Sequence, residues 1–455
     1  MRLIEAMNAG DVFLGLKVLF PRAFFFESAQ LSVIGLDYDE VLRLRGAQVE
    51  VTRGGLTQVC EEDFLTVVQT RLSEFPSKAA SFPYEFGGVF GCLGYEVMGL
   101  IEPKLQKQGY FRDLSQGTEV LAEVFVSHNV IVFHHATNQI HFALRDHQLG
   151  LADLPTRRHR GPARVLSNEV EEALKNHGTA KFLRAVQSIK SHIQQGNIFQ
   201  AVLSQRFEVA VETSAIVLFE SVRALCPSSY SFYFDFKESQ FFGASPETLL
   251  KIEDGELETH PIAGTRPRGQ SAVLDRALET ELLSDEKEAA EHLMLVDLSR
   301  NDIGRVAQAG SVRVAAFREL MHLPNVMHLI SVVRGTKKIE KTDLAALCSC
   351  FPAGTLTGAP KLRAMEVLAE LESRPRGFYG GAVVAFDFAG GLDSCIAIRS
   401  VEVKHGQAIL RAGAGIVADS TPEAEYQEII HKLRGLVCAL QSAETCPELL
   451  LGVSP

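Results

Sequence analysis

The chain has 455 residues, of which 46% are hydrophobic and 22% charged, and its formal net charge is −11. This balance is typical of a soluble globular protein with two or three domains, or one large two-part fold. The negative charge argues against nonspecific nucleic-acid binding, so an anionic ligand would need a local positive site or a metal ion. No membrane association is expected, because no apolar run reaches a membrane span and the start lacks a secretory signal. The eight scattered cysteines favour a reducing, cytoplasmic compartment.

The first part of the chain is rich in short apolar runs separated by glycines. Two of these runs, 124–126 and 130–133, predict strands joined by Ser-His-Asn. We therefore expect a strand-rich region over residues 1–150. The polar, basic and proline-containing stretch 153–163 predicts a linker or a surface loop, and a second region is expected over residues 175–442.

A helix and a strand are predicted at the start of the second region. Apolar residues at helical spacing predict a helix over 179–195, which Gly196 would end. The run 196–205 predicts a strand with apolar residues on both faces, so Gln200 should be buried. A buried amide without partners costs about 1–3 kcal/mol. Gln200 is therefore either a core residue bonded to backbone or a group that orients a neutral nucleophile, which it cannot deprotonate.

Glu247 is a candidate general acid. It lies in the run 241–250, where apolar residues precede it and a Ser-Pro turn presents it. A carboxyl group in such a setting can have a raised pKa and donate a proton to a leaving group. The alternative, equally favoured by the pattern, is an ordinary acid at a helix N-terminus.

Two ionisable residues lie inside a helix predicted to begin near Asp285. Its body, 289–298, is apolar nearly all round, which predicts burial. Glu291 and His292 are therefore costly unless they are paired, hydrogen-bonded or bound to a metal. A buried pair tied to another segment is as consistent with the pattern as a functional site.

The last helix is predicted to open at Ser420, where Glu423 has capping-box spacing and Pro422 suits the first turn. Glu428 lies roughly opposite the apolar stripe and, considered by itself, belongs to a solvated face. Together with Glu291 it would suit a hard cation such as Mg²⁺. The stripe itself comprises Tyr426, Ile429, Ile430, Leu433, Val437 and Leu440.

Three glycine-rich loops permit close approach to a ligand: 261–265, 354–361 and 412–415. None has the spacing of a nucleotide-binding motif, and tight turns explain glycines equally well. His328 is a single histidine in an apolar strand, a position more often filled by a core residue. Arg399 ends a strand-like run, where a buried arginine often binds a carboxylate in a fork.

Taken together, these segments resemble the chorismate-utilising enzymes, and within them the anthranilate synthase large-subunit branch. The resemblance is highly specific over about residues 180–440 and weaker over the first 150. The matching segments occur in the family's order, at 261–269, 285–298, 351–361, 379–382, 398–400 and 412–420.

The resemblance implies an α+β fold, a mixed α/β sandwich of two packed sheets. It also implies Mg²⁺ held by Glu291 and Glu428 on the ring carboxylate of chorismate, which reverses the solvated interpretation of Glu428. Glu247 would protonate the leaving hydroxyl as ammonia attacks the ring, and His328 would assist the later loss of pyruvate. Gln200 and Thr355 also match active-site positions, and the implied ligand contacts are Gly264, Thr265, Tyr379, Arg399, Gly413, Ala414 and Gly415.

Two positions distinguish branches of the family. The isochorismate and salicylate branch resembles this chain but has Lys where Gln200 stands, so Gln200 favours an amine product. The aminodeoxychorismate branch usually has Lys where Ala263 stands, so Ala263 favours anthranilate. Because the chain lacks an amidotransferase nucleophile motif, the expected ammonia source is a separate glutamine amidotransferase subunit, component II. The alternatives are an aminodeoxychorismate or aminodeoxyisochorismate synthase, and a noncatalytic regulatory subunit that binds chorismate or tryptophan.

Tryptophan feedback is doubtful in this chain. Relatives inhibited by tryptophan carry Leu-Leu-Glu-Ser and Asn-Pro-Ser-Pro-Tyr-Met runs, whose counterparts here are residues 25–28 and 226–231. Ser28 and Tyr230 match that pattern, whereas Cys226, Ser229 and Ser231 depart from it. The candidate regulatory residues are Ser28, Ser229, Tyr230 and Ser231.

Overall fold

The computed structural model shows a sandwich of two large sheets flanked by helices. Every strand pairing among the residues it describes is antiparallel. None of the helices in these parts of the chain combines the length and the apolar character that crossing a membrane requires. The described residues are 7–74, 80–112, 114, 117, 119–155, 178–322, 326–372 and 374–445.

The first sheet has ten strands among the described residues. Their order is β18 (Gly358–Ala359), β10 (Gln200–Ala210), β22 (Gln407–Ile416), β21 (Ser400–Lys404), β12 (Gln240–Gly243), β11 (Ser231–Asp235), β1 (Phe24–Glu27), β2 (Leu31–Gly35), β8 (Asn129–His134) and β9 (Gln139–Leu144).

The second sheet has twelve strands in the same described ranges. Eleven follow the order β15 (Ile262–Pro267), β17 (Val326–Thr336), β14 (Glu256–Thr259), β13 (Thr248–Glu253), β20 (Leu392–Ile396), β19 (Ala382–Asp387), β6 (Gly88–Leu93), β7 (Val120–Ser127), β3 (Glu40–Arg45), β4 (Gln48–Arg53) and β5 (Leu56–Cys60). The twelfth, β16 (Arg313–His322), pairs with β17.

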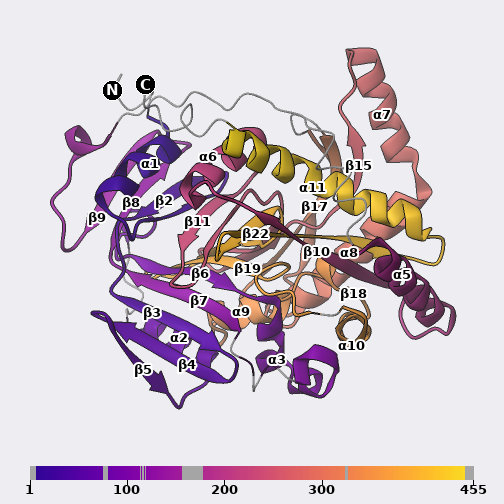
Figure 1. The fold of residues 1–455 in the computed structure, drawn as a ribbon, viewed down its shortest axis with the longest axis horizontal. Helices are drawn as coiled ribbons and strands as arrows, with labels where there is room; N and C mark the ends of the chain where they lie inside the picture. Colours follow the sequence, from indigo (N-terminus) through magenta and orange to yellow (C-terminus); the bar gives the residue numbers. More distant parts are fainter. Residues whose placement is uncertain are drawn as a thin grey trace.

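Helices cover the outer face of each sheet, and in Figure 1 α11 lies across β22, while α5 packs on β10 and α6 on β12. The α-helices are α1 (Ala9–Leu19), α2 (Phe64–Ser73), α3 (Met98–Ile101), α5 (Thr179–Gln194), α6 (Ala215–Leu225), α7 (Ala272–Ser284), α8 (Glu286–Gly304), α9 (Asp343–Cys350), α10 (Lys361–Leu371) and α11 (Pro422–Thr445). Short 3-10 helices are η2 (Tyr95–Val97), η3 (Pro103–Lys107), η4 (Gly109–Arg112), η6 (Leu151–Asp153) and η7 (Gly354–Leu356).

The core is built in three apolar layers. The layer between the sheets is rich in aromatic side chains, including Phe24, Phe125 and Phe234, whose rings contact one another. A second layer lies under the helices of the first sheet, and a third lies between the second sheet and α2, α8 and α9. Each sheet therefore buries both faces, which explains the continuous apolar runs of the central strands.

The two sequence regions do not form two separate sheets. Strand β7 belongs to the second sheet and β8 to the first, so the chain crosses the sandwich at His128. Both sheets contain strands from residues 1–150 and from 175–442. The two regions thus share one core, while residues 156–163 of the expected linker lie outside the described residues.

Several predicted elements are confirmed. Helix α5 spans Thr179–Gln194, strand β10 begins at Gln200, and Gln200 is only 3% exposed. The predicted burial of both faces was wrong at Phe199. This side chain is 71% exposed, because the residue lies just before the strand begins. All six residues of the predicted stripe on α11 are buried.

Two expectations about helices were wrong in part. Helix α8 buries only one face: His292 and Leu295 are buried, whereas Leu293 is 49% exposed. The expected capping box of α11 does not form, since the Ser420 hydroxyl accepts a hydrogen bond from Val417 instead and the helix begins two residues later, at Pro422. In both cases the tertiary surroundings override the local pattern.

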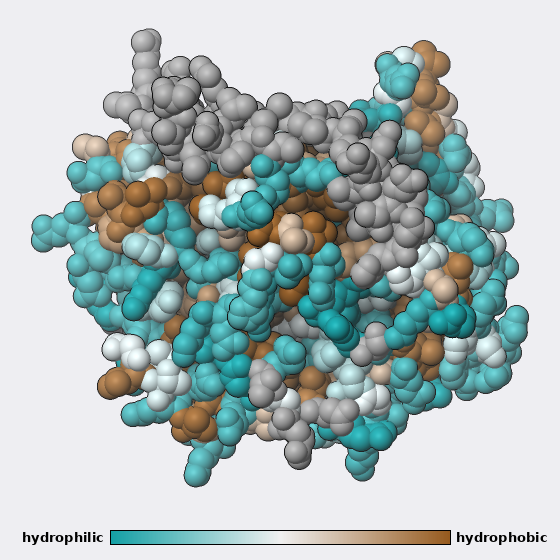
Figure 2. Space-filling model, viewed as in Figure 1, coloured by the Kyte–Doolittle hydropathy of each residue, from teal (hydrophilic) through white to brown (hydrophobic). Residues whose placement is uncertain are grey.

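Helix α7 projects from the body of the molecule (Figure 1). Figure 2 shows hydrophobic residues on this projection, in contrast to the mostly hydrophilic surface around them. Val273 is 82% exposed and Leu274 is 46% exposed. Leu282 of this helix packs with Met327 and Leu329 in a small separate core, and ion pairs of Asp275 and Glu281 with Arg268 and Arg266 also hold the helix.

Candidate active site

A cavity of about 500 Å³ opens where β10 and β22 of the first sheet approach β15 and β17 of the second, with α8 and α11 beside them. Twelve of the thirteen predicted catalytic, ligand-binding and metal positions line it. These are Gln200, Glu247, Gly264, Thr265, Glu291, His328, Thr355, Tyr379, Arg399, Gly413, Gly415 and Glu428. Segments more than 200 residues apart in the chain thus meet in one place.

The thirteenth position, Ala414, does not line the cavity. Side chains alternate along a strand, so Gly413 and Gly415 face the cavity while the Ala414 methyl group points to the other face. There Ala414 is fully buried in the core beneath the helices. Any contact of Ala414 with a ligand would therefore come from its backbone.

The buried Gln200 and the half-buried Glu291 form a hydrogen-bonded pair in the wall of the cavity. The Gln200 amide donates a hydrogen bond of 3.0 Å to Glu291 Oε1, which satisfies the amide that burial would otherwise penalise. Burial raises the pKa of Glu291, and the Gln200 hydrogen bond partly opposes that shift. The pair thus presents a neutral amide and a carboxylate whose charge is only partly compensated.

Glycines make room for this pair. A Cβ atom on Gly415 would lie 2.7 Å from the Gln200 amide nitrogen, and one on Gly413 would lie 3.0 Å from the Leu203 carbonyl oxygen. Neither position has space for a larger residue without displacing a neighbour. Residues 412–415, expected to form a loop, lie within strand β22, and their glycines let the cavity reach the strand backbone.

The buried Glu247 and the half-buried Thr355 form a second hydrogen-bonded pair. The Thr355 hydroxyl donates a 2.8 Å hydrogen bond to Glu247 Oε1. Burial raises the pKa of Glu247 to about 7, although the Thr355 hydrogen bond and the positive charge of Lys432 act in the opposite direction. A carboxyl group with this pKa is substantially protonated near neutral pH and can donate that proton.

Arg399 is held in an unusual conformation beside the cavity. Its φ of 50° lies in the left-handed region, and its guanidinium donates to the Lys432 carbonyl. Burial lowers the pKa of Arg399, and no carboxylate of the described chain forms an ion pair with it. A desolvated guanidinium of this kind is suited to an anionic ligand.

Tyr379 and Lys432 line the cavity together with Arg399. Tyr379 is buried, and burial raises the pKa of its hydroxyl to about 12, so the group stays a neutral hydrogen-bond donor. Lys432 donates to the Gly413 carbonyl at 2.9 Å and lies 3.4 Å from Glu428. The helix α11 thus brings both a cation and a carboxylate to the cavity.

His328 lies on β17 opposite Thr265 of the neighbouring strand β15, so residues 262–265 form part of a strand and not the expected loop. Its Nδ1 is 3.1 Å from the Gly264 carbonyl oxygen and 3.1 Å from the Thr265 hydroxyl. Burial lowers the pKa of His328, which favours a neutral imidazole at neutral pH. By contrast, His292 bonds Ser331 and faces the core, so of the neighbouring pair Glu291 and His292 only Glu291 reaches the cavity.

Sequence reasoning missed several charged residues of the cavity. Glu288 lies one helical turn before Glu291, and Glu425 one turn before Glu428. The repeated three-residue spacing of acids on two helices was the available signal, because such residues share a helix face. Lys287 and Arg411 also line the cavity and gave no comparable signal.

The candidate regulatory residues lie away from this cavity. Ser28 and Ser229 line a separate cavity of about 570 Å³. Tyr230 is buried and donates a 2.9 Å hydrogen bond to Asp393, and Ser231 is buried at the start of β11. Two of the four residues, Ser28 and Ser229, therefore line this separate cavity, whereas Tyr230 and Ser231 are buried and do not line it.

Comparison with known proteins identifies the family. The model of the chorismate binding enzymes matches residues 22–437. The chain belongs to this family.

Several similar curated relatives are named anthranilate synthase component 1. The anthranilate synthase component 1 of Bacillus subtilis is 41% identical over 384 residues, which cover 79% of this chain and 74% of that protein. The anthranilate synthase component 1 of Pseudomonas aeruginosa is 36% identical over 455 residues, covering 94% of this chain and 92% of that protein. The match therefore extends through both sequence regions.

Solved structures of the family have the same fold. Anthranilate synthase component I from Streptococcus pneumoniae superposes with a TM-score of 0.74 at 32% identity, covering 90% of this chain and 92% of that one. The menaquinone-specific isochorismate synthase of Escherichia coli has a TM-score of 0.67 at 18% identity, covering 96% and 92%. The expected two-sheet α+β sandwich is thereby confirmed.

Proposed function

We propose that the protein is the large subunit of an anthranilate synthase, which converts chorismate and ammonia to anthranilate and pyruvate in tryptophan biosynthesis. The observation that carries this proposal is the placement of Gln200, a group without a useful basic pKa, beside Glu291 in the cavity that holds the buried acid Glu247. The names of the relatives at 36–41% identity support the same reaction.

The charges of the cavity suit a dianionic substrate. Arg399 and Tyr379 would bind the enolpyruvyl carboxylate of chorismate, since a buried guanidinium and a neutral hydroxyl converge there. Glu247 would donate its proton to the departing hydroxyl group. Gln200 would orient the attacking ammonia without protonating it, and His328, as a neutral imidazole, would assist the elimination of pyruvate.

The carboxylates of α8 and α11 fit a magnesium ion. Within the described residues, no group of three or more metal-binding side chains is already gathered. Mg²⁺ is commonly held by one or two carboxylates, waters and the substrate itself, so Glu291 and Glu428 suffice as its protein ligands. When bound there, Mg²⁺ would withdraw charge from the ring carboxylate. The raised pKa of Glu291 marks a carboxylate that a cation would stabilise.

Ammonia would come from a partner. We propose a glutamine amidotransferase subunit, anthranilate synthase component II, as the source, and a cytoplasmic location for the assembly. The relatives' designation as component 1 supports a second component. Free ammonium at high concentration should replace the partner in the reaction.

A product assay tests the proposed function. The purified chain is incubated with chorismate, Mg²⁺ and excess ammonium at mildly alkaline pH, and the products are separated by mass and fluorescence. Anthranilate with equimolar pyruvate is expected. A nonaromatic amino product without pyruvate would identify an aminodeoxychorismate or aminodeoxyisochorismate synthase instead. Absence of turnover, both with ammonium and with the amidotransferase partner, would leave a noncatalytic binding subunit.

Replacing Gln200 with Lys should weaken amination and introduce addition of water. A lysine amine beside Glu291 can accept a proton from water, which the amide cannot. We expect slower anthranilate formation and a hydroxylated, nitrogen-free product, both followed by mass spectrometry. Gln200→Glu is the matched control, because it changes the charge without adding a basic amine. Unchanged ammonia-dependent rates in Gln200→Lys would remove Gln200 from this role.

Replacing Glu291 with Gln should raise the magnesium concentration needed for half-maximal activity by about tenfold or more, since a charged oxygen ligand is lost. The control is Asp297→Asn, which removes an exposed carboxylate from the same helix α8. Activity is titrated with Mg²⁺ at saturating chorismate. An unchanged titration curve in Glu291→Gln would contradict a ligand role.

A further inference from the structure

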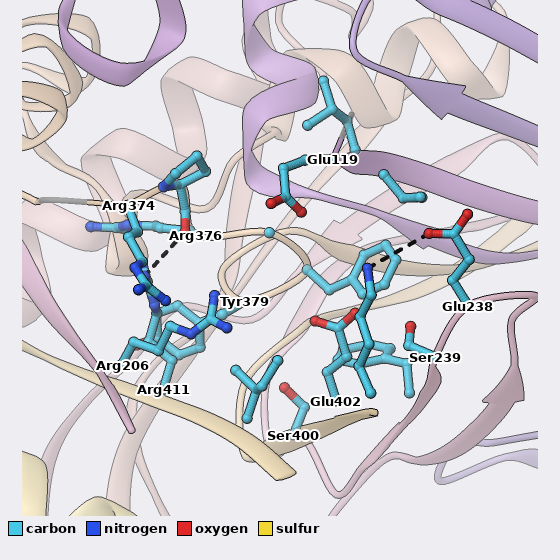
Figure 3. Close-up of a pocket in the computed structure, with 18 of the residues that line it drawn as sticks. Glu119, Arg206, Glu238, Ser239, Arg374, Arg376, Tyr379, Ser400, Glu402 and Arg411 are labelled. Atoms are coloured by element: carbon cyan, nitrogen blue, oxygen red, sulfur yellow. Dashed lines mark hydrogen bonds and ion pairs between the residues drawn. The ribbon is translucent and has the colours of Figure 1, made fainter. Parts of the chain in front are cut away.

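Two further cavities adjoin the active-site cavity, and the larger one has charged walls that are already paired. Figure 3 shows this cavity, of about 440 Å³, which shares Tyr379 and Arg411 with the active site. Arg376 donates to both oxygens of Glu372, at 2.9 and 2.8 Å, and Arg411 lies 3.6 Å from the same carboxylate. These charges therefore compensate one another within the protein.

The smaller cavity, of about 30 Å³, lies against the active-site cavity, with Glu247, Leu295 and Thr355 lining both spaces. One water molecule needs about 10–15 Å³ of such space and about two to four polar partners. Besides Glu247 and Thr355, the polar side chains in its lining include His260 and Asp302. The smaller cavity is therefore large and polar enough for one or two ordered water molecules, in reach of the Glu247 carboxyl group.

Glu247 needs a new proton after each turnover. In the proposed reaction it gives its proton to the departing hydroxyl group and is left as a carboxylate. The ammonia nitrogen loses its own proton beside Gln200 and Glu291, which form a separate pair, whereas Glu247 is bonded to Thr355. Bound chorismate would occupy the larger space on one side of Glu247. The smaller cavity is then the side from which water can reach the carboxylate.

His260 connects the smaller cavity to solvent, since it lines the cavity and its side chain is 27% exposed. Its Nε2 lies 2.7 Å from Glu258 Oε1. This hydrogen bond, together with Arg334, lowers the pKa of Glu258 to about 2, so Glu258 is a carboxylate that accepts from Nε2–H. The other ring nitrogen, Nδ1, lies 3.3 Å from the hydroxyl of Thr248, which also lines the cavity. The ring is thus held between a surface carboxylate and the cavity.

The other ionisable groups of the smaller cavity are less suited to carry protons. Asp302 is buried and accepts a 2.8 Å hydrogen bond from the Lys361 ammonium group, which keeps it engaged. Cys350 is also buried, and burial raises the pKa of its thiol to about 12. Histidine, by contrast, gains and loses a proton readily near neutral pH. Among the described residues of this lining, His260 therefore combines contact with solvent and a proton that exchanges easily.

We propose that His260 returns a proton to Glu247 after each turnover, through one or two water molecules in the smaller cavity. This role rests on the proposed function. The His260 imidazolium gives a proton from Nδ1 to a cavity water, and that water passes a proton on to the Glu247 carboxylate. The neutral ring then takes a proton from solvent, so the site returns to its starting charge. His260 acts through Glu247 and does not contact the substrate.

The test replaces His260 with Gln and with Ala in the whole chain, and measures steady-state anthranilate formation with Mg²⁺, saturating ammonium and a low buffer concentration. Gln keeps an N–H donor for Glu258 but cannot carry a proton. We expect kcat to fall about tenfold or more in both variants at an unchanged KM for chorismate. Added imidazole should restore most of the rate of His260→Ala, because it supplies the missing proton donor.

Two comparisons separate proton supply from a structural effect. In both variants the rate should rise with the concentration of the buffer acid, whereas the unmodified chain should not respond. The matched control is His322→Ala, which removes an exposed histidine that pairs with Glu279 at 2.8 Å, as His260 pairs with Glu258. This control should change neither kcat nor the response to imidazole. Thermal unfolding at the same temperature as the unmodified chain verifies that each variant folds.

The outcomes distinguish this role from the proposed function. Normal anthranilate formation by the unmodified chain, with an unchanged kcat in His260→Gln, would overturn the role of His260 alone. A lowered kcat that neither imidazole nor buffer acid restores would also overturn it, because it would indicate a structural effect. Absence of turnover in the unmodified chain, with ammonium and with the amidotransferase partner, would overturn the proposed function and the role of His260 with it.

Discussion

Replacing Glu247 with Gln should lower kcat for anthranilate formation by about 10²–10⁴-fold, the usual contribution of a general acid. The substitution keeps the shape of the side chain and its position beside Thr355, but it removes the proton that the departing hydroxyl needs. The KM for chorismate should change little, because Glu247 is not assigned to substrate binding. A decrease of less than about tenfold would contradict the assignment.

The pH dependence gives an independent check on Glu247. Burial raises its pKa to about 7, so the acid form is present below that pH and is lost as the pH rises through it. With rates expressed per concentration of free NH₃, kcat should fall above about pH 7, and this limb should be absent in Glu247→Gln. Thr355→Val should move the limb to higher pH, because the Thr355 hydrogen bond lowers the pKa of Glu247. Glu366→Gln, in an exposed ion pair on α10, should leave the profile unchanged.

Replacing Arg399 with Gln should lower kcat/KM for chorismate by about 10²-fold or more, mainly through a higher KM. Arg399 presents a desolvated guanidinium without a carboxylate partner among the described residues. Its loss would leave a substrate carboxylate buried without a compensating charge. Arg399→Lys should restore only part of the loss, since an ammonium group cannot bind a carboxylate in a fork.

The measurement for Arg399 is steady-state kinetics at saturating ammonium and Mg²⁺, with thermal unfolding to verify that each variant folds. Arg300→Gln removes a guanidinium from an exposed pair with Asp297 and is the matched control. Equal KM values for Arg399→Gln and the unmodified chain would exclude Arg399 from carboxylate binding. A large change in kcat at constant KM would instead assign it to the transition state.

Local patterns in the sequence were sufficient for the elements with strong periodicity. The stripe of α11 and the burial of Gln200 on β10 followed from the spacing of apolar residues, because a side chain's direction is set by its own helix or strand. The raised pKa of Glu247 followed from the apolar residues that precede it, because desolvation dominates that shift. The two-sheet fold, by contrast, came from the family resemblance rather than from periodicity.

Long-range arrangement was beyond the sequence patterns. Nothing local indicates that the chain changes sheets at His128, or that α8 exposes Leu293. The pattern of a solvated face at Glu428 is confirmed, since the residue is exposed, but Glu428 also lines the cavity because α11 packs on β22. Which face of a helix meets solvent depends on what packs against it, and that is decided elsewhere in the chain.

By itself, then, the sequence determined which residues could carry the chemistry: a buried amide, a carboxyl group with a raised pKa, acids on two helices and glycines that admit a ligand. The tertiary structure decided which of them meet. It placed the Gln200 amide nitrogen 3.0 Å from Glu291 Oε1 across 91 positions of sequence, and it turned the Ala414 methyl group away from the cavity. Strand register decides the direction of Ala414, because a shift of one residue would reverse every side chain on the strand. The contact between Gln200 and Glu291 depends in addition on where helix α8 lies relative to β10.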